Sequence, residues 1–368
     1  QITERLLERV RQEYKPEEIA AEEMALKRLG LFPADKDYLE VVIELLKSQI
    51  AGFYDPWEKQ LYIADWTGGG DEVMAHEIDH ALQDQHFGLE RWMRAVKSNA
   101  DATVARQALV EGDGTALMLE FAAAARGAPP PWGDQAAVTE MARGLRMGMF
   151  LMGNAPLVLR ESLLFPYVNG LKFVAHVRRT RPWSAVDAIY RKPPLSTEHI
   201  IHPETYDTYE RPVEVKAAAP ATIASYKRGY DNVLGELALW IFLREHGVDE
   251  GQAKVAVAGW GGDRVAVFTP PGRPGAVSSA VAVVYTVWDQ EADAAEFMDA
   301  LGKALPGLAG KGATERDAAG VMEMRGADGS VVSAERRGDA VVMVVGAPPA
   351  RADELRAQVW KSWVVKRP

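Results

Sequence analysis

The chain has 368 residues, of which 48% are hydrophobic and 26% are charged, a globular composition that excludes a disordered, collagen-like or coiled-coil protein. The net charge is −10, and the sequence contains no block of like charge. Both observations argue against a nucleic-acid partner or binding to an anionic membrane surface. Because cysteine is absent, disulfides and thiolate sites are excluded, and any metal must be bound by the seven histidines and the carboxylates.

The cellular compartment of the protein is predicted from the start of the chain and from its composition. The sequence opens on Gln1-Ile2-Thr3-Glu4, which resembles neither a signal peptide nor an initiator methionine, and no segment reaches the roughly 18 apolar residues of a membrane helix. A chain without cysteine tolerates an oxidising compartment. We therefore expect an extracytoplasmic protein (periplasmic, cell-surface or secreted), with a leader or lipid anchor possible upstream of Gln1.

Helices are expected through most of the first 215 residues. Residues 1–50 have apolar residues at helical spacing, residues 52–63 are typical of a two-stranded hairpin, and Gly68 to Gly70 ends this unit. Asp71 is the expected N-cap of the next helix. The predicted helices cover residues 71–86, 99–126, 138–152, 168–179 and 184–190, and residues 192–209 are predicted to be an irregular loop.

The pattern changes towards strands in the last third. Residues 212–216 and 220–225 are predicted to be a linker, and the sequence Trp260-Gly261-Gly262-Asp263-Arg264 to be a turn. We expect a two-layer α+β domain with a mixed or antiparallel sheet over residues 216–368. Its predicted helices are 232–246, 291–305 and 350–363, and its predicted strands are 264–269, 280–287, 321–325, 331–335 and 340–345.

His76-Glu77-Ile78-Asp79-His80 forms an H-E-x-x-H motif inside a predicted helix, with roughly 0.02 matches expected by chance. Residues four apart share one helix face, so both imidazoles can bind a single Zn²⁺. Glu77 is offset around the helix and can reach a zinc-bound water. The alternative is a solvated helix that happens to carry two histidines.

A catalytic zinc bound by two histidines needs one further protein ligand, which leaves the fourth position to water. Glu111 is the best candidate, because it lies in an otherwise apolar helix where an unpartnered carboxylate is costly to bury. Gly112 and Gly114, each disfavoured in a helix by about 1 kcal/mol, indicate a close approach to another backbone, expected to be that of the helix carrying the two histidines. The alternative places Glu111 on a solvated face.

Two acidic residues could support the ligands. Asp113 and Asp84 could each accept an imidazole N–H and so fix its tautomer, or they could be ordinary acids. His86 is expected to be a cap or surface residue.

These residues resemble those of gluzincin-type zinc metallopeptidases, in which two histidines of a helix and a downstream glutamate bind zinc. Residues 75–87, AHEIDHALQDQHF, are similar to the HELTHALQDQ stretch of a poorly characterised group of prokaryotic metallopeptidases. The chain departs from this group at Asp79, Gly114 and His199, where threonine, alanine and glutamine are usual. Similar patterns also occur at Gly52-Phe53-Tyr54-Asp55-Pro56, Glu111-Gly112-Asp113, Pro194-Leu195-Ser196-Thr197-Glu198 and His202-Pro203, so the resemblance covers most of residues 50–265.

The resemblance implies an α+β architecture: a mainly helical zincin-like domain with a small hairpin over residues 1–215, followed by the smaller α+β domain as scaffold or substrate-recognition module. Zincin-like folds usually supply a sheet edge above the metal helix, and the hairpin at residues 52–63 could bind substrate by strand addition. Leu61, Tyr62 and Ile63 are then expected to line the cleft. The alternative is a hairpin that only stabilises the fold.

Zinc lowers the pKa of bound water towards about 7, and Glu77 would take its proton and pass it to the leaving amine. The oxyanion needs a further donor. The candidates are His202, His199, Tyr206 and Tyr167, and each could instead anchor a loop or pack in the core. We favour His202, because the first three of them lie in one Pro-bounded loop, and we place Tyr167 second.

The leading hypothesis is therefore a zinc metallopeptidase that hydrolyses a peptide or protein substrate. One alternative is a catalytically inactive zincin-like binding or scaffold protein, and another is a zinc hydrolase of a non-peptide substrate. Glu77 argues against the scaffold, because a structural zinc site needs no general base and usually has four protein ligands.

Overall fold

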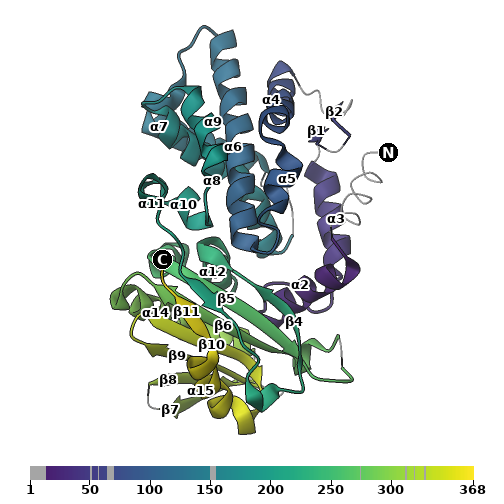
Figure 1. Ribbon diagram of the computed structural model, residues 1–368, viewed down its shortest axis with the longest axis vertical. Helices are drawn as coiled ribbons and strands as arrows, with labels where there is room; N and C mark the ends of the chain where they lie inside the picture. Colours follow the sequence, from purple (N-terminus) through teal and green to yellow (C-terminus); the bar gives the residue numbers. More distant parts are fainter. Residues whose placement is uncertain are drawn as a thin grey trace. The chain divides into compact units, whose positions relative to one another are not determined.

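The computed structural model describes residues 14–49, 52–56, 58–63, 70–149, 155–273, 275–310, 313–318, 320–326 and 329–368, which form two compact units of mixed α+β structure (Figure 1). The helical unit consists of Val42–Ala155 and Leu159–Glu210. The sheet unit consists of the described residues up to Val41, of Pro156–Val158 and of Arg211–Pro368. The helix expected before residue 14 and the glycines expected at 68 and 69 lie outside the described residues. No helix in the described ranges is long and apolar enough to span a membrane.

The helical unit contains the long helices and the hairpin that the sequence predicts. Gly70, not Asp71, is the N-cap of α4, and Gly88 ends this helix in the left-handed conformation with φ 66°. Asn99 caps α6 by accepting a hydrogen bond from the Ala102 N–H. The elements of this part of the chain are α3 (Tyr38–Gln49), β1 (Gly52–Asp55), β2 (Gln60–Ile63), α4 (Asp71–Phe87), α5 (Leu89–Arg94), α6 (Ala100–Ala125), α7 (Gln135–Met149), α8 (Leu157–Arg178), α9 (Trp183–Arg191), α10 (Thr197–Ile201) and α11 (Pro203–Thr208).

The two glycines of α6 allow two different close approaches. A Cβ atom on Gly112 would lie 2.3 Å from the carbonyl carbon of Gly170, and one on Gly170 would lie 2.0 Å from the Ala108 carbonyl oxygen. At Gly112 the backbone that α6 meets is that of α8, so the predicted approach to the histidine-bearing helix is wrong at this glycine. The approach of α6 to α4 is found at Gly114, whose added Cβ would meet the His76 ring.

The sheet unit is built on a seven-stranded sheet in the order β4-β5-β6-β10-β9-β8-β7, with every described pairing antiparallel. A second sheet pairs β3 with β11. The elements are α2 (Pro16–Arg28), β3 (Glu214–Lys216), β4 (Lys227–Asn232), α12 (Gly235–Glu245), α13 (Glu250–Val257), β5 (Trp260–Thr269), β6 (Val281–Trp288), α14 (Glu291–Ala309), β7 (Thr314–Ala318), β8 (Val321–Arg325), β9 (Val331–Arg337), β10 (Ala340–Ala347), α15 (Ala352–Ser362) and β11 (Val364–Lys366).

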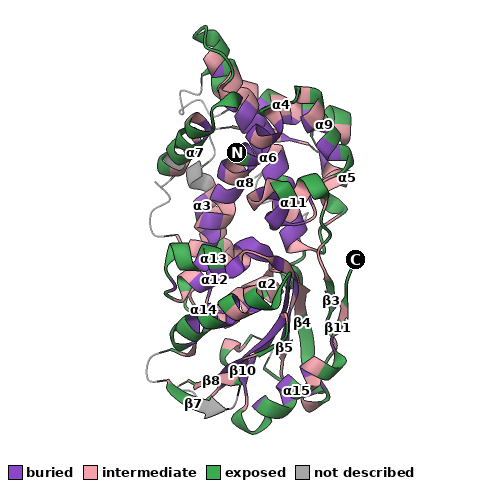
Figure 2. Cartoon of the chain, turned by 90° about the vertical axis from the view of Figure 1, so that its left-hand side faces the viewer, coloured by how far each residue is buried: buried purple, intermediate pink, exposed green. Residues whose placement is uncertain are grey.

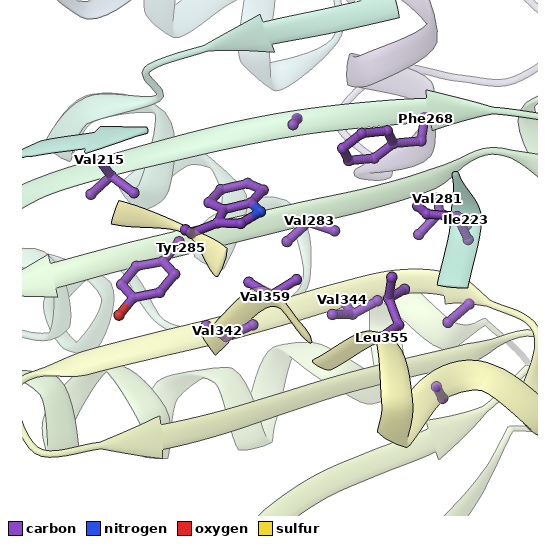
Figure 3. Packing of buried hydrophobic residues seen from close by; sticks show 14 of the residues in the cluster. Val215, Ile223, Phe268, Val281, Val283, Tyr285, Val342, Val344, Leu355 and Val359 are labelled. Carbon is purple, nitrogen blue, oxygen red and sulfur yellow. The ribbon is translucent and has the colours of Figure 1, made fainter. Parts of the chain in front are cut away.

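Both faces of this sheet are covered. Alternate residues of β6 and β10 pack with Leu355 and Val359 of α15 on one face (Figure 3). On the other face Trp288 of β6 packs against Phe297 of α14, with ring centroids 4.6 Å apart. Every residue of β6 and β10 is therefore buried (Figure 2). The predicted α+β class with an antiparallel sheet is confirmed, but the prediction of two layers is wrong.

Some boundaries differ from the predictions because tertiary pairing stabilises short segments. The predicted linker contains β3, and Val215 and Ile223 from this region are in the core. The predicted turn at residues 260–264 is the start of β5, where a bulge lies between Trp260 and Gly262. The predicted loop at 192–209 contains α10 and α11, and α8 begins before its internal Pro166.

The described N-terminal residues belong to the sheet unit, whereas the sequence analysis assigned them to the first domain. Leu29, Leu31 and Phe32 are each at most 3% exposed. His246 of the sheet unit donates a hydrogen bond from Nε2 to the Leu29 carbonyl, at 2.9 Å. This contact joins segments that are more than 200 residues apart, so the sequence pattern gives no sign of it.

Candidate metal centre

His76 and His80 of α4 and Glu111 of α6 bring three potential ligand atoms together. The Nε2 atoms of His76 and His80 are 3.0 Å apart, and they lie 3.3 and 3.4 Å from Oε2 of Glu111. The two helices lie side by side (Figure 1), and the helical spacing of the histidines turns both rings towards α6. The expected grouping of these three residues is present.

The donor set fits a zinc ion in chemistry and spacing. Tetrahedral zinc with bonds of about 2.0–2.1 Å separates its ligand atoms by about 3.3–3.4 Å. Oε2 of Glu111 is buried and makes no hydrogen bond of good geometry, and the two imidazole nitrogens face it at 3.3 and 3.4 Å. Two nitrogens and one carboxylate oxygen leave one of four positions for water, as catalytic zinc sites do.

The electrostatics of the cluster favour a positive charge. Burial alone would raise the pKa of Glu111, but the two histidines outweigh it and hold the pKa well below its usual range. Burial alone would lower the pKa of His80, but the carboxylates of Glu111 and Glu77 raise it to about 10. The cluster thus stabilises a cation where the three ligand atoms meet.

Glu77 lies beside the cluster as a buried carboxylate with one free oxygen. It is 6% exposed, and its Oε2 has no hydrogen-bond partner. Burial raises its pKa, while the two histidines and the backbone N–H of Tyr54 in β1 act in the opposite direction. A raised pKa suits a group that must take up and release a proton near neutral pH.

Tyr167 of α8 also contacts the cluster. Its ring stacks on His76 with centroids 6.2 Å apart. Its pKa is raised well above the usual value, first by the charge of Glu111 and then by burial, and it also hydrogen-bonds to Glu111. The phenol therefore stays protonated and can donate a hydrogen bond.

Gly114 provides space for the histidine rings. A Cβ atom at this position would lie 2.9 Å from Nδ1 of His76 and 3.3 Å from Cε1 of His80. The absence of a side chain at Gly114 thus lets α6 approach the ring pair closely.

Gln83, which the sequence analysis missed, contacts His80 on the ring nitrogen that faces away from the other two ligands. The distance between Nδ1 of His80 and Oε1 of Gln83 is 3.0 Å. The Nε2 group of Gln83 lies within hydrogen-bond distance of Asp79, Asp113 and the Val110 carbonyl, which share its two N–H groups. Its position three residues after His80, on the same helix face, was the available signal.

The two acids considered as supports have other partners. Asp84 accepts hydrogen bonds from the Tyr54 hydroxyl and from Lys59, so it fastens the hairpin to α4. Asp113 accepts hydrogen bonds from Gln83 and from Tyr190. Asp113 thus reaches His80 through Gln83, and the hydrogen bonds described for the two acids are to groups other than an imidazole. Burial raises the pKa of Asp113 to about 7.

The candidates for the oxyanion donor separate into two groups. His199 is fully buried, with Nε2 donating to the Glu210 carbonyl at 2.7 Å, and the Tyr206 hydroxyl donates to the Lys192 carbonyl at 2.8 Å. These contacts anchor their loop. His202 lies 3.8 Å from Glu204 through its Nδ1, and this contact does not involve the cluster. Tyr167 is the candidate that contacts a predicted ligand.

The hairpin reaches the cluster through β1. The Tyr54 N–H binds Glu77, and Tyr54 pairs with Leu61 of β2 in the ladder. Leu61 is 39% exposed, so it stays available to line a cleft. His86 binds the Leu82 carbonyl at the end of α4, in agreement with its expected role near the helix terminus.

Comparisons with known proteins concern the other unit. A family model described as a domain of unknown function (DUF8575) matches residues 224–356, within the sheet unit. No curated protein and no solved structure matches the chain. The helical unit and its cluster thus lie outside the matched residues, and their function must be inferred from the residues themselves.

Proposed function

We propose that this protein is a zinc-dependent metallopeptidase whose ion is bound by His76, His80 and Glu111. The observation that carries the proposal is the convergence of two imidazole Nε2 atoms on a buried carboxylate oxygen that has no hydrogen-bond partner. A buried polar atom without a partner is costly unless it binds an ion or water. The H-E-x-x-H spacing supplies both histidines from one helix.

When bound, zinc would acidify a water molecule and polarise the substrate carbonyl. Glu77 accepts the water proton at its free Oε2 while the hydroxyl adds to the carbonyl carbon. Glu77 then gives that proton to the amide nitrogen as the C–N bond breaks, so the products are a carboxylic acid and an amine. The Tyr167 hydroxyl, which hydrogen-bonds to Glu111, would exchange that bond for one to the oxygen that gains negative charge.

Glu77 supports a catalytic site over a structural one. A structural zinc is usually enclosed by four protein ligands. Here a fourth side chain with a free carboxylate oxygen lies beside the three ligands, and its burial would be an unneeded cost in a scaffold.

The proposal is tested by zinc content and hydrolysis of an unfolded protein such as reduced casein, for the wild type and Glu77→Gln. We expect one zinc per chain in both proteins and hydrolysis only by the wild type. Absence of stoichiometric zinc in metal-replete protein would overturn the proposal. Zinc without hydrolysis of casein or a peptide library would instead indicate a scaffold or a hydrolase of another substrate.

A further inference from the structure

We infer that Gln83 is a positioning residue that holds His80 with its Nδ1 protonated, so that Nε2 keeps its lone pair for a metal ion. This inference deepens the proposed function and rests on it. Gln83 is 3% exposed and lies within α4, three residues after His80. Its amide contacts one predicted ligand on one side and acceptor groups on the other.

The orientation of the Gln83 amide is determined by its neighbours. Its Nε2 lies 3.2 Å from the Val110 carbonyl oxygen, which can only accept hydrogen bonds. The same nitrogen lies 2.6 Å from a carboxylate oxygen of Asp79 and 3.2 Å from one of Asp113. Rotating the amide by 180° would set its oxygen against the Val110 carbonyl oxygen, which can only accept, so the nitrogen must face this side.

The orientation of the amide fixes the tautomer of His80. With its nitrogen facing the acceptors, Gln83 presents Oε1 to Nδ1 of His80 at 3.0 Å. An amide oxygen only accepts, so Nδ1 must carry the proton that it donates. In the neutral ring Nε2 is then unprotonated, and this is the nitrogen that faces His76 and Glu111.

Gln83 also links the two helices that carry the ligands. The Val110 carbonyl belongs to the peptide bond that precedes Glu111, so one side chain contacts His80 directly and α6 next to the third ligand. Asp113, one of its other partners, is held by the Tyr190 hydroxyl at 2.9 Å. The amide is therefore fixed from α6 as well as from α4, and partners of this kind usually change metal affinity by about 10–100-fold.

The test uses the full chain with ¹⁵N-labelled histidine, both metal-free and zinc-loaded. The His80 signals are assigned by their loss in His80→Gln. Gln83→Leu removes the acceptor, and Gln83→Met does so with less change in volume if the leucine variant fails to fold. Gln85→Leu is the matched control, because Gln85 lies on the same helix and is exposed.

We expect the Nδ1 proton of His80 in the wild type to be shifted downfield and to exchange slowly with water. This signature should be lost in Gln83→Leu and kept in Gln85→Leu, and zinc affinity should fall about 10–100-fold only in the former. An unprotonated Nδ1 in the wild type, or a proton signal unchanged by Gln83→Leu, would overturn the inference. Since the signature is read without metal too, failure of zinc binding would overturn the proposed function separately.

Discussion

The buried carboxylate of Asp263 in the sheet unit and those of Glu77 and Glu111 in the helical unit differ in their hydrogen-bond partners. In the sheet unit Asp263 accepts hydrogen bonds from the N–H groups of Leu234 and Gly235 and from the Trp260 indole, with both carboxylate oxygens used. In the helical unit Glu77 and Glu111 each keep one buried oxygen without a hydrogen-bond partner. The charge of Asp263 thus holds the start of α12 against β5, whereas Glu111 faces two histidines and Glu77 keeps one oxygen without a hydrogen bond.

This difference distinguishes Asp263 from the two carboxylates at the cluster. A buried carboxylate with all its partners stabilises the fold and offers nothing to a ligand. Free buried oxygens reduce stability, and they are retained where binding or chemistry uses them. Substitutions at the two kinds of carboxylate should therefore have opposite consequences for activity and stability.

The largest effect is expected for Glu77→Gln. The amide cannot take up the water proton, so peptide hydrolysis should fall by about 10³-fold or more while zinc stays bound. Initial rates on casein measure this effect. Glu72→Gln is the matched control, because Glu72 is exposed on the same helix and should retain full activity. Equal rates for wild type and Glu77→Gln would refute the role of Glu77 as general base.

Next is the pair Glu111→Gln and Asp263→Asn, which tests the comparison directly. Loss of the Glu111 charge should weaken zinc binding by more than about 100-fold, because a ligand matters more than the partners that support it. Asp263→Asn leaves zinc binding unchanged but turns an N–H donor towards other donors, and should lower the free energy of unfolding by about 1–3 kcal/mol. Zinc competition titrations and urea unfolding measure the two effects. Unaltered zinc affinity in Glu111→Gln would mean that the third ligand lies elsewhere.

Tyr167→Phe should lower the rate of hydrolysis by about 100-fold, the typical effect of losing one oxyanion donor. Zinc affinity should also fall, by up to about 10–100-fold, because the phenol hydrogen-bonds to the ligand Glu111, so the rates are compared at saturating zinc. The parallel substitution Tyr206→Phe removes a hydroxyl that anchors a loop and should leave the rate nearly unchanged. If the two variants behave alike, another group must serve the oxyanion.

Gly112→Ala tests the crossing of α6 and α8 that places Glu111 and Tyr167. Its Cβ would lie 2.3 Å from the Gly170 backbone, so the variant should lose about 1–3 kcal/mol of stability through overpacking. Gly144→Ala in α7 is the control: its Cβ meets nothing within 4 Å, and higher helix propensity should add about 0.5–1 kcal/mol. Urea unfolding measures both variants. A stable Gly112→Ala protein would contradict this packing.

The smallest effect concerns the response of the sheet unit to pH. Burial lowers the pKa of His246, although its hydrogen bond to Leu29 opposes the shift. The unfolded chain therefore binds the proton more readily, and stability should fall as the pH drops below about 6.5. His246→Gln should lose less stability than the wild type between pH 7 and pH 5, as measured by urea unfolding. An equal loss in both proteins would assign the acid sensitivity to other groups.

The sequence predicted local features well and tertiary ones poorly. The H-E-x-x-H helix, Glu111 and most strands of the sheet follow from periodicity and spacing, which are properties of short segments. The pairing of β3 with β11, the contact of Gly112 with Gly170 and the attachment of the N-terminal residues to the sheet unit depend on residues far apart in the chain. No local pattern encodes such partners.

The same limit explains the error about the supporting residues. Asp84 and Asp113 were considered because acids commonly hold metal-binding histidines. In the structure Asp84 accepts hydrogen bonds from Tyr54 and Lys59. The residue that hydrogen-bonds to His80 is the neutral Gln83. Only the fold shows that Gln83 has acceptors on its other side, which is what fixes its orientation.

The most direct test of the central claim is a crystal structure of the zinc-loaded protein with diffraction recorded at the zinc absorption edge. The account predicts one anomalous peak about 2.0–2.1 Å from Nε2 of His76, Nε2 of His80 and Oε2 of Glu111, with no fourth protein ligand. A peak elsewhere, or a fourth side chain that closes the coordination sphere, would contradict it.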